Sequence, residues 1–492
     1  MNVLFIYPHF PDTFWSFKYA LSFIGKRSAF PPLGLLTVAA MLPEEWPKRL
    51  VDLNVQALTA KDFAWADIAF VGSMAVQRKS AREVIARCIA EGLKVVCGGP
   101  LFTAEPENFA EVDHLVLDEA ELTLPAFLKD LQKGTPQKIY RAKGFCDLRH
   151  TPPPLMNLVN MKRYASMNIQ FSRGCPHNCE FCNVTVLLGH RPRVKTPSQI
   201  IVELDNLYNA GWRGNIFFVD DNFIGNKRYL KTELLPALLD WRQGKKGCVF
   251  YTEVTINLAD DPDLLALLVR AGFDTVFIGI ESPDNASLDE CKKTQNKNRD
   301  LLGNVKRIHQ AGLQVMGGFI IGFDNDTTAT FERQIDFIQT SGIVTAMVGM
   351  LQAPPGTRLF ERLKAENRLT GRFSGDNVDG TTNIIPHMGK TRLLEGYRAI
   401  MGQIYSHHFY YRRVKTFLAE FKTPDIVVPL DIQRFLAFFR SGFWLGFWSK
   451  GRFQFWNLLL WTLVHKPKLV PLAVTLSIYG YHYRRICELY IL

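Results

Sequence analysis

The chain has 492 residues, of which 47% are hydrophobic and 21% are charged. This length exceeds what one hydrophobic core usually organises, and the composition excludes a disordered protein, so we expect two or three folded domains. The net charge of +11 would suit nucleic acid or an anionic membrane. Much of it lies near the C-terminus, where residues 434–492 contain eight Lys or Arg and one acid, Glu488.

Nothing in the sequence is typical of secretion or of membrane spanning. Six of the nine cysteines are scattered, which does not fit a disulfide framework and favours a reducing cytoplasm. No basic residue precedes the first apolar stretch, which ends at Pro8. The longest late apolar run, 453–464, contains Gln454 and Asn457 and is shorter than the ~20 residues of a spanning helix. We therefore expect no transmembrane segment.

Residues 1–140 alternate short apolar runs with helical patterns, which predicts an α/β domain with an open, Rossmann-like parallel sheet. The expected strands are 3–7, 49–53, 68–72, 93–97 and 114–117. Ligands of such sheets bind beyond the carboxyl ends of the strands. Ser73, Gly98 and Gly99 lie at two of these ends, and the glycines permit close approach of a ligand to the backbone. A tight turn without a ligand is the alternative interpretation.

A proline-rich segment, Thr151-Pro-Pro-Pro154, cannot continue a helix or a central strand and marks a linker, which we place at 141–160. Beyond it, residues 161–370 contain six strand–helix units that predict a partial (βα)6 barrel. The expected strands are 168–172, 215–219, 248–254, 275–280, 314–321 and 345–351. We expect a mostly helical third region over residues 371–492.

Three cysteines, Cys175, Cys179 and Cys182, follow the first strand of the predicted barrel within eight residues. Thiolates are the usual ligands of iron–sulfur clusters, and three of them would leave one iron of a [4Fe-4S] cube open. A structural zinc site would need a fourth ligand, for which His177 or His190 is the nearest candidate. Chance clustering is the remaining alternative.

The pattern Cys175-x-x-x-Cys179-x-Phe181-Cys182 after the first barrel strand resembles the radical S-adenosylmethionine (SAM) superfamily. The resemblance implies that the open iron chelates SAM and that the reduced cluster cleaves it to a 5′-deoxyadenosyl radical. The ends of later barrel strands also look like the family's SAM-binding segments. Residues implied to contact SAM are Phe181, Asp220, Asp221, Glu281, Gly317 and Gly322.

An α/β domain ahead of such a barrel resembles the cobalamin-dependent subgroup of this superfamily. The resemblance implies that Ser73, Gly98 and Gly99 belong to a cobalamin site. The Asp-x-His-x-x-Gly loop that supplies a cobalt ligand in many cobalamin domains is missing, and His9 lies in a different pattern. We therefore interpret His9 as an ordinary loop residue and expect a cobalamin without a histidine ligand.

These resemblances imply a cobalamin-dependent methyltransferase that acts on an unactivated carbon, with an electron donor such as flavodoxin or ferredoxin. A cobalamin-dependent cyclase or rearrangement enzyme is one alternative, and an RNA methylthiotransferase is another. The latter carries more cluster cysteines and a C-terminal β-barrel, neither of which this sequence indicates. A cobalamin sensor without catalysis is the non-enzyme alternative, and it has no use for the three cysteines.

The C-terminal region gives the only indication of the substrate, since it is similar to the extension of a subgroup that contains hopanoid methylases. Tryptophans such as Trp444 and Trp448 alternate there with cations such as Arg440 and Lys450. This pattern suits an interface between water and lipid, and the alternative is the aromatic core of a helical cap. We expect a small-molecule or lipid substrate, peripheral contact with the inner face of a membrane, and no nucleic acid.

Overall fold

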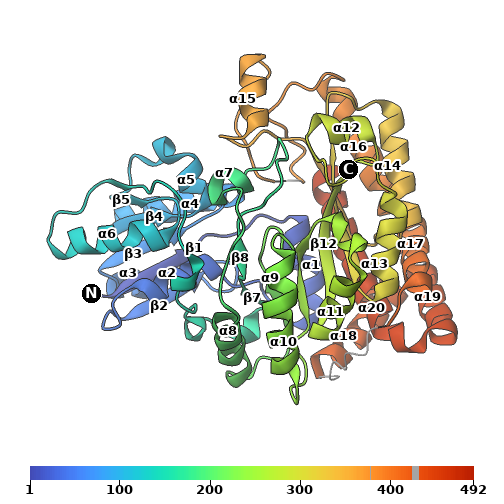
Figure 1. Ribbon diagram of the computed structural model, residues 1–492, viewed down its shortest axis with the longest axis horizontal. Helices are drawn as coiled ribbons and strands as arrows, with labels where there is room; N and C mark the ends of the chain where they lie inside the picture. The colour runs from blue at the N-terminus through green and yellow to red at the C-terminus, as the bar shows by residue number, and fades with distance from the viewer. Residues whose placement is uncertain (377, 424–431) are drawn as a thin grey trace.

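The computed structural model describes residues 1–376, 378–423 and 432–492, and its framework is two six-stranded parallel sheets. Figure 1 shows the N-terminal sheet (blue to cyan) at one end of the molecule and the central sheet (green to yellow) beside the C-terminal helices. A short antiparallel pair, β8 (Ser172–Arg173) with β9 (Arg193–Val194), follows the first strand of the central sheet in the chain.

The N-terminal sheet has the strand order β2-β1-β3-β4-β5-β6, with every neighbouring pair parallel. Its strands are β1 (Val3–Tyr7), β2 (Lys48–Asp52), β3 (Ile68–Gly72), β4 (Lys94–Gly98), β5 (His114–Val116) and β6 (Ile139–Tyr140). The connecting helices are α2 (Leu33–Met41), α3 (Ala60–Trp65), α4 (Arg78–Ala90), α5 (Pro100–Ala104) and α6 (Ala120–Gln132). The open, Rossmann-like sheet expected from the sequence is confirmed, and the two-residue strand β6 is an addition to it.

The central sheet has the order β14-β13-β12-β11-β10-β7, so each parallel strand lies beside its predecessor. Its strands are β7 (Ser166–Ile169), β10 (Asn215–Phe218), β11 (Phe250–Val254), β12 (Phe273–Glu281), β13 (Gln314–Ile321) and β14 (Ala346–Met350). The helices between them are α7 (Val184–Leu188), α8 (Pro197–Asn209), α9 (Lys227–Tyr229), α10 (Leu235–Arg242), α11 (Pro262–Ala271), α12 (Asn285–Glu290), α13 (Leu301–Ala311) and α14 (Thr328–Ser341). Within the described chain β7 and β14 do not pair, so the barrel is partial, as expected.

Local sequence signals explain where the central helices begin and end. Helix α8 begins at a capping box, because Thr196 accepts from the backbone of Gln199 while the Gln199 side chain accepts from the backbone of Thr196. Helix α11 begins where Asp261 accepts from the backbone of Leu264 and ends at Gly272 in the left-handed region. These caps fix the lengths of the connections, and so the positions of the strand ends that follow them.

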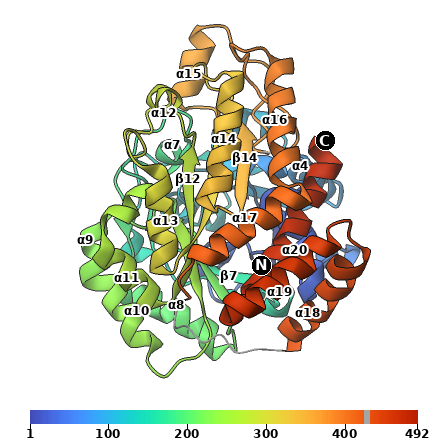
Figure 2. The same cartoon turned by 90° about the vertical axis from the view of Figure 1, so that its right-hand side faces the viewer.

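The C-terminal helices are α15 (Arg358–Ala365), α16 (Lys390–Ile404), α17 (His407–Glu420), α18 (Ile432–Phe443), a π-helix η10 (Trp444–Trp448), α19 (Arg452–His465) and α20 (Val470–Ile486). Of these, α16 and α17 pack on α13, α14 and the edge strand β14, on the side of the molecule that faces the viewer in Figure 2. Buried Arg413 joins this layer to α14, since it donates to the side-chain oxygen of Gln339 at 2.6 Å. None of the helices in the described residues is long and apolar enough to cross a membrane.

The segment between β1 and α2 leaves its own sheet and packs against the end of the chain. It contains the 3-10 helices η1 (Phe14–Ser16) and η2 (Ser22–Ile24) and the short helix α1 (Lys18–Leu21). The ring of Phe14 lies 5.5 Å from that of Tyr483, and a ring nitrogen of His482 hydrogen bonds to the Phe14 carbonyl. Residues from the two ends of the sequence therefore pack together, and those of the N-terminal segment, Phe14 among them, also line the cavity described next.

Candidate active site

A cavity of about 1400 Å³ lies between the carboxyl ends of the two parallel sheets. The N-terminal sheet lines it with Tyr7 of β1, Gly72 of β3, Gly98 of β4 and Val116 of β5. The central sheet lines it with Asn168 of β7, Phe217 of β10, Glu253 of β11 and Phe277 of β12. Ligands of parallel α/β sheets bind at these strand ends, and here two such ends face one space.

Glycines expose the backbone at one part of the N-terminal wall of the cavity. Gly99 has φ +96°, and a Cβ there would lie 3.2 Å from the carbonyl oxygen of Ser73. A Cβ on Gly98 would lie 2.7 Å from the carbonyl oxygen of Val116. Ser73, Gly98 and Gly99 all line the cavity, so the structure brings these three residues together as a backbone surface that a large ligand can approach. His9 lies exposed at the rim.

The opposite wall is aromatic. Phe217 stacks on Tyr251 with ring centroids 4.7 Å apart, and Phe30 approaches the other side of Phe217 at 5.5 Å. Trp15 of the N-terminal segment lies 5.2 Å from Phe277 of β12. Such rings offer broad apolar contact area, which favours a largely apolar molecule on this side of the cavity.

The three predicted cluster cysteines lie in the loop between β8 and α7, and all three are partly exposed. Gly174 makes the tight start of this loop possible, because its φ is +94° and a Cβ would lie 2.8 Å from the carbonyl oxygen of Arg191. The other six cysteines are buried. The chain therefore offers these three thiols, and not the others, to an inorganic group.

Contacts from the last part of the barrel hold the cysteine loop in place. Arg362 of α15 forms an ion pair with Glu180 at 2.9 Å, and Arg358 donates to the carbonyl of Asn178. The ring of Phe181 packs 6.4 Å from that of Phe323, which follows β13. The turn Pro355-Gly356-Thr357 precedes α15, and it places Arg358 and Arg362 of that helix against the cysteine loop.

The donor set of the loop fits an iron–sulfur cluster better than a single ion. In the described ranges, no three His, Cys, Asp or Glu side chains converge closely enough to hold one metal ion. A [4Fe-4S] cube binds each thiolate at a different iron, so its ligands do not need to converge on one point. Burial raises the pKa of Cys182 to about 12, so this thiol is uncharged until a metal replaces its proton.

The two adjacent aspartates after β10 have different environments. Asp220 is fully buried and accepts from the backbone of Phe171 at 3.1 Å and from the backbone and hydroxyl of Ser172. Its oxygens therefore hold the strand end that leads into the cysteine loop. Asp221 is only partly buried and lies close enough to Cys175 and Cys182 to influence their pKa values. Burial raises the pKa of Asp221 to about 6.

Glu281 ends β12 in the left-handed region, with φ 64°, and its carboxylate pairs with Lys293 at 2.6 Å. Burial opposes the charge on Lys293, yet Glu281 and the nearby Cys179 leave its pKa raised. Gly279 makes room for this pair, because a Cβ there would lie 2.2 Å from a Glu281 oxygen. A non-glycine residue held at positive φ is typical of a functional strand end.

Sequence reasoning missed three polar side chains of this region. Lys293 is one, and Gln295, whose amide lies 3.6 Å from the sulfur of Cys179, is the second. The third is Glu253, whose pKa burial raises to about 8, with Asp221 and Asp220 adding to the rise. The only signal for Glu253 was its place at the end of a predicted strand, as for Asp221. Nothing in the sequence marked the lysine or the glutamine.

The two glycines assigned to SAM occupy different surroundings. A Cβ on Gly317 would meet the rings and methyls of Phe319 and Ile343, so this glycine serves packing inside β13. Gly322 follows the end of β13 with φ +103°, and its N–H donates to Asp326 at 2.8 Å. Only Gly322 lies at the strand end where a ligand would approach.

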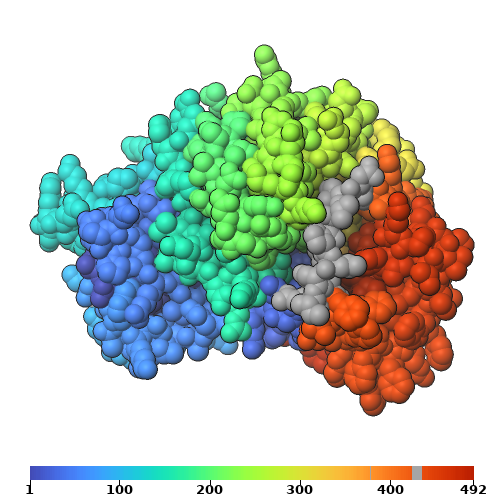
Figure 3. Space-filling view, turned by 90° about the horizontal axis from the view of Figure 1, so that it is seen from below, coloured from blue at the N-terminus to red at the C-terminus, as the bar shows by residue number. Residues whose placement is uncertain are grey.

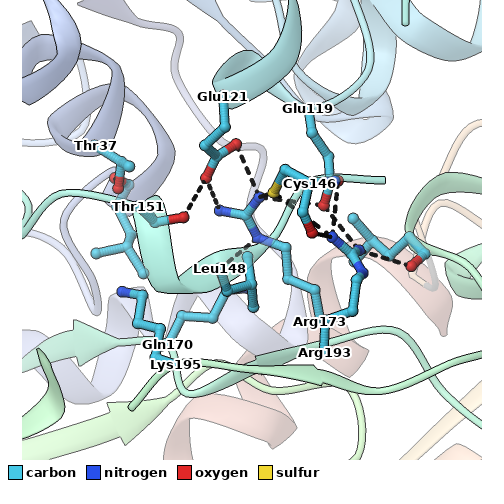
Figure 4. A network of polar contacts seen from close by, with 12 residues as sticks. Thr37, Glu119, Glu121, Cys146, Leu148, Thr151, Gln170, Arg173, Arg193 and Lys195 are labelled. Atoms are coloured by element: carbon cyan, nitrogen blue, oxygen red, sulfur yellow. Dashed lines mark hydrogen bonds and ion pairs between the residues drawn. The ribbon is translucent and has the colours of Figure 1, made fainter. Parts of the chain in front are cut away.

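A buried network of charges joins the N-terminal sheet to the base of the cysteine loop (Figure 4). Arg173 and Arg193 are opposite residues of the antiparallel pair β8–β9, where like charges repel. Glu121 pairs with Arg173 at 2.8 Å and Glu119 pairs with Arg193 at 2.8 Å. The carboxylates at the start of α6 therefore neutralise the two arginines that close the loop, and Cys146 lies among them.

Two parallel sheets around a shared cavity, a three-cysteine loop at the edge of one and a glycine surface at the edge of the other define a cobalamin-dependent radical SAM enzyme. Comparison with protein families agrees with this class. The B12 binding domain matches residues 27–128, the Radical SAM superfamily matches 169–338, and a domain of unknown function, DUF4070, matches 357–491.

Whole-chain comparisons give the particular family. An uncharacterised methyltransferase of Synechocystis sp. is 40% identical over 99% of this chain and 92% of its own length. The hopanoid C-2 methylase of Rhodopseudomonas palustris is 34% identical over 94% of this chain and 89% of its own. The solved cobalamin-dependent SAM radical enzyme OxsB, at 16% identity, has the same fold, with a TM-score of 0.62 over 100% of this chain and 84% of that one.

The chain belongs to the cobalamin-dependent radical SAM methyltransferases. Its cofactors are a [4Fe-4S] cluster, SAM and cobalamin, and it requires a reductant and a small-molecule substrate. These findings confirm the class of enzyme and the cofactors expected from the sequence. The roles of individual residues stay predictions, as does the division into regions 1–140, 161–370 and 371–492.

Proposed function

We propose that this enzyme methylates an unactivated carbon of an apolar lipid of the hopanoid type. The observation that carries this proposal is the aromatic wall of the cavity, which Phe30, Phe217 and Phe277 form opposite the glycine surface. A polycyclic hydrocarbon has large apolar faces and few polar groups, so rings on one side of the space can position it by contact alone. The likeness to a hopanoid C-2 methylase supports the same substrate class.

The cofactors would lie one after another, with cobalamin in the cavity and the cluster at the cysteine loop, whose three cysteines do not themselves line the cavity. The proposal assigns the cluster to Cys175, Cys179 and Cys182, and cobalamin to the surface formed by Ser73, Gly98 and Gly99. It assigns SAM to the space between them, bordered by these groups: Phe181, Asp221, Glu281, Lys293 and Gly322. The cofactors supply radical generation and methyl transfer, so no side chain needs to act as nucleophile.

The protein residues would position, shield and balance charge. Lys293 forms an ion pair with Glu281 and lies beside two of the cluster cysteines. Its ammonium group can balance the charge of the carboxylate of bound SAM. Asp221 can accept a hydrogen bond from the ammonium group of bound SAM. Asp220 acts through the backbone of 171–172, which it holds at the start of the cysteine loop. The aromatic wall excludes water from the reacting carbon.

The proposal places the enzyme in the cytoplasm at the inner face of the membrane, with residues 371–492 as the part that meets lipid. An electron carrier of the flavodoxin or ferredoxin type would supply the reductant.

The test is anaerobic reconstitution with iron, sulfide and cobalamin, followed by incubation with SAM, a reductant and a hopanoid hydrocarbon. A product heavier by one methylene, formed together with 5′-deoxyadenosine and S-adenosylhomocysteine, is the expected result. A rearranged product of unchanged mass, formed without S-adenosylhomocysteine, would favour the rearrangement alternative. Turnover only with polar substrates would contradict the lipid assignment.

A further inference from the structure

Large apolar side chains stand exposed in a row along α18 and η10. Phe447 and Trp448 are 65% and 64% exposed, and Phe439 and Phe443 are also more than half exposed. Ring contacts join part of the row, with Phe443 at 5.8 Å from Trp444 and 6.4 Å from Trp448. We call Phe439, Phe443, Trp444, Phe447 and Trp448 the aromatic face.

The buried side of the same helices carries mostly small residues, with one leucine. Ala437 and Ser441 point inward from α18, and Leu445 and Gly446 do so from η10. Folding in water normally buries the large rings and exposes the small side chains. The reverse arrangement here, with the rings gathered outward, indicates a partner that offers apolar contact on this side.

Charge indicates which partner this is. Between residues 432 and 487 the sequence contains no Asp or Glu. Arg440, Lys450, Arg452 and Lys468 are exposed in this segment, next to the aromatic face or on α19 and the turn after it. Phenylalanine and tryptophan that enter a headgroup layer, with arginine and lysine at its surface, form the usual composition of a peripheral binding site for anionic lipid.

The aromatic face also lies beside the rim of the cavity. Helix α18 packs on η2, and Arg440 donates to the carbonyl of Phe23 at 2.9 Å. Cavity-lining residues continue directly from η2, through Ser22 and Gly25 to Ser28. In Figure 3 the C-terminal helices form a red lobe at the end of the molecule away from the N-terminal sheet, so a flat surface could reach it.

We propose that the aromatic face docks on an anionic lipid bilayer, and that this docking turns the cavity rim at residues 22–28 towards the bilayer so that an apolar substrate enters from the membrane. The docking part of the proposal depends only on the exposed rings and basic residues of the surface. The entry part rests on the proposed function, because only a lipid substrate would use such a route.

The first experiment measures sedimentation of the full chain, reconstituted with its cofactors, with vesicles of phosphatidylcholine alone or mixed with phosphatidylglycerol. Binding to the mixed vesicles, weakened at high salt as the Debye length falls from about 10 Å at 0.1 M to about 3 Å at 1 M, is the expected result. Equal binding to both vesicle types, or none to either, overturns the proposal.

Two variants locate the surface. The triple change Trp444→Ser, Phe447→Ser, Trp448→Ser should weaken binding roughly tenfold or more, and so should Lys450→Glu with Arg452→Glu. The matched control changes three exposed apolar residues elsewhere to serine, namely Leu122, Val202 and Ile385, and should bind as the wild type does. Thermal melting checks that each variant is folded. Full binding by the folded triple variant overturns the proposal.

Sedimentation velocity without lipid separates a membrane from a second copy of the chain. If the aromatic face holds a dimer that the triple change dissociates, and vesicles do not compete with it, the docking proposal is wrong. The entry route has its own readout: substrate held in mixed vesicles should be methylated faster than substrate in detergent by the wild type, and not by the triple variant. No methylation in either form contradicts the proposed function and leaves the docking result standing.

Discussion

At the scale of single residues, the site depends on side chains that are absent as much as on those present. Gly279 leaves the space that the Glu281–Lys293 pair fills, and Gly174 lets the cysteine loop leave β8 next to the carbonyl of Arg191. A methyl group at either position would overlap polar atoms that cannot move without breaking the pair or the loop. Substitutions at these two glycines should therefore act on the cofactors before they act on the fold.

The cysteine loop makes the most direct prediction. Changing Cys175, Cys179 and Cys182 together to Ala should reduce iron after anaerobic reconstitution to near zero, because the remaining cysteines are buried. Cys88→Ala and Cys248→Ala, made one at a time, are the controls and should keep their iron. Iron analysis and the visible absorption of the cluster measure the outcome, and about four irons per chain in the triple variant would contradict the assignment.

Glu253 predicts a pH dependence of stability for the apoprotein. Its pKa rises from the ordinary value of 4.5 to about 8 on burial, so the folded chain keeps a proton that the unfolded chain releases. Stability is therefore full below the unfolded pKa and is lost as pH rises through about 8. In Glu253→Gln the loss should disappear, and the variant should melt a few degrees above wild type at high pH, about 2–4 °C for each kcal/mol recovered.

Melting curves between mildly acidic and mildly alkaline pH test this expectation. Glu361→Gln, at an exposed position on α15, is the control and should follow the wild-type curve. Parallel curves for wild type and Glu253→Gln over the whole range would show that the carboxyl does not titrate as the structure indicates.

At the scale of elements, the turn after β4 should determine cobalamin binding. Gly99→Ala places a methyl group 3.2 Å from Ser73 at a backbone conformation reserved for glycine, which costs about 1–3 kcal/mol. We expect lower stability and loss of bound cobalamin after gel filtration. Gly134→Ala is the control, because Gly134 has φ +74° with nothing within 4 Å of its Cβ. It should lose stability and retain cobalamin.

The elements themselves follow closely from the sequence. Strands such as 3–7, 68–72 and 314–321 have the predicted bounds, because a parallel strand buried on both faces is a continuous apolar run between turn signals. The three cysteines could also be predicted to lie together, because they fall within eight residues of one another in the sequence. Glu253 and Lys293 could not be predicted, since their position depends on which strand ends and loops the sheet brings together.

The C-terminal region shows the other limit of sequence patterns. The aromatic and basic composition predicted either the core of a helical cap or a lipid interface. The structure contains both buried and exposed aromatic residues in this region. Phe455 and Leu458 are buried. Phe453, which follows the aromatic face in the sequence and precedes Phe455, is 73% exposed. Helical periodicity alone does not say which stripe faces inward when both stripes carry apolar groups.

At the scale of the whole molecule, the Glu119–Glu121 network should determine how firmly the two sheets are joined. Arg173→Met leaves Glu121 buried without its partner, and removal of one member of a buried pair costs about 3–5 kcal/mol. Glu121→Gln added to Arg173→Met should recover part of this loss, so a double-mutant cycle in urea should show coupling. Arg149→Met, which breaks the exposed pair with Asp147 in the same linker, is the control and should change little.

Limited proteolysis of the linker around Cys146 gives a second measurement of the same prediction. Cleavage should be faster in Arg173→Met than in wild type, because Cys146 loses one of the two arginines that surround it. Cleavage at the wild-type rate, together with an additive double-mutant cycle, would show that packing alone joins the sheets.

The contact between the two ends of the chain also orders events during synthesis. His482 lies 468 residues after Phe14, whose carbonyl it bonds. Because ribosomes add about 5–20 residues per second, Phe14 is synthesised about 20–90 s before His482. During that time Phe14 and Phe23 have no cover from α20. We expect ribosome-bound chains halted before α20 to recruit hydrophobic-binding chaperones, and release of the completed α20 to end that association. Completing the packing behind Phe14, which lines the cavity, would thus be among the last steps of translation.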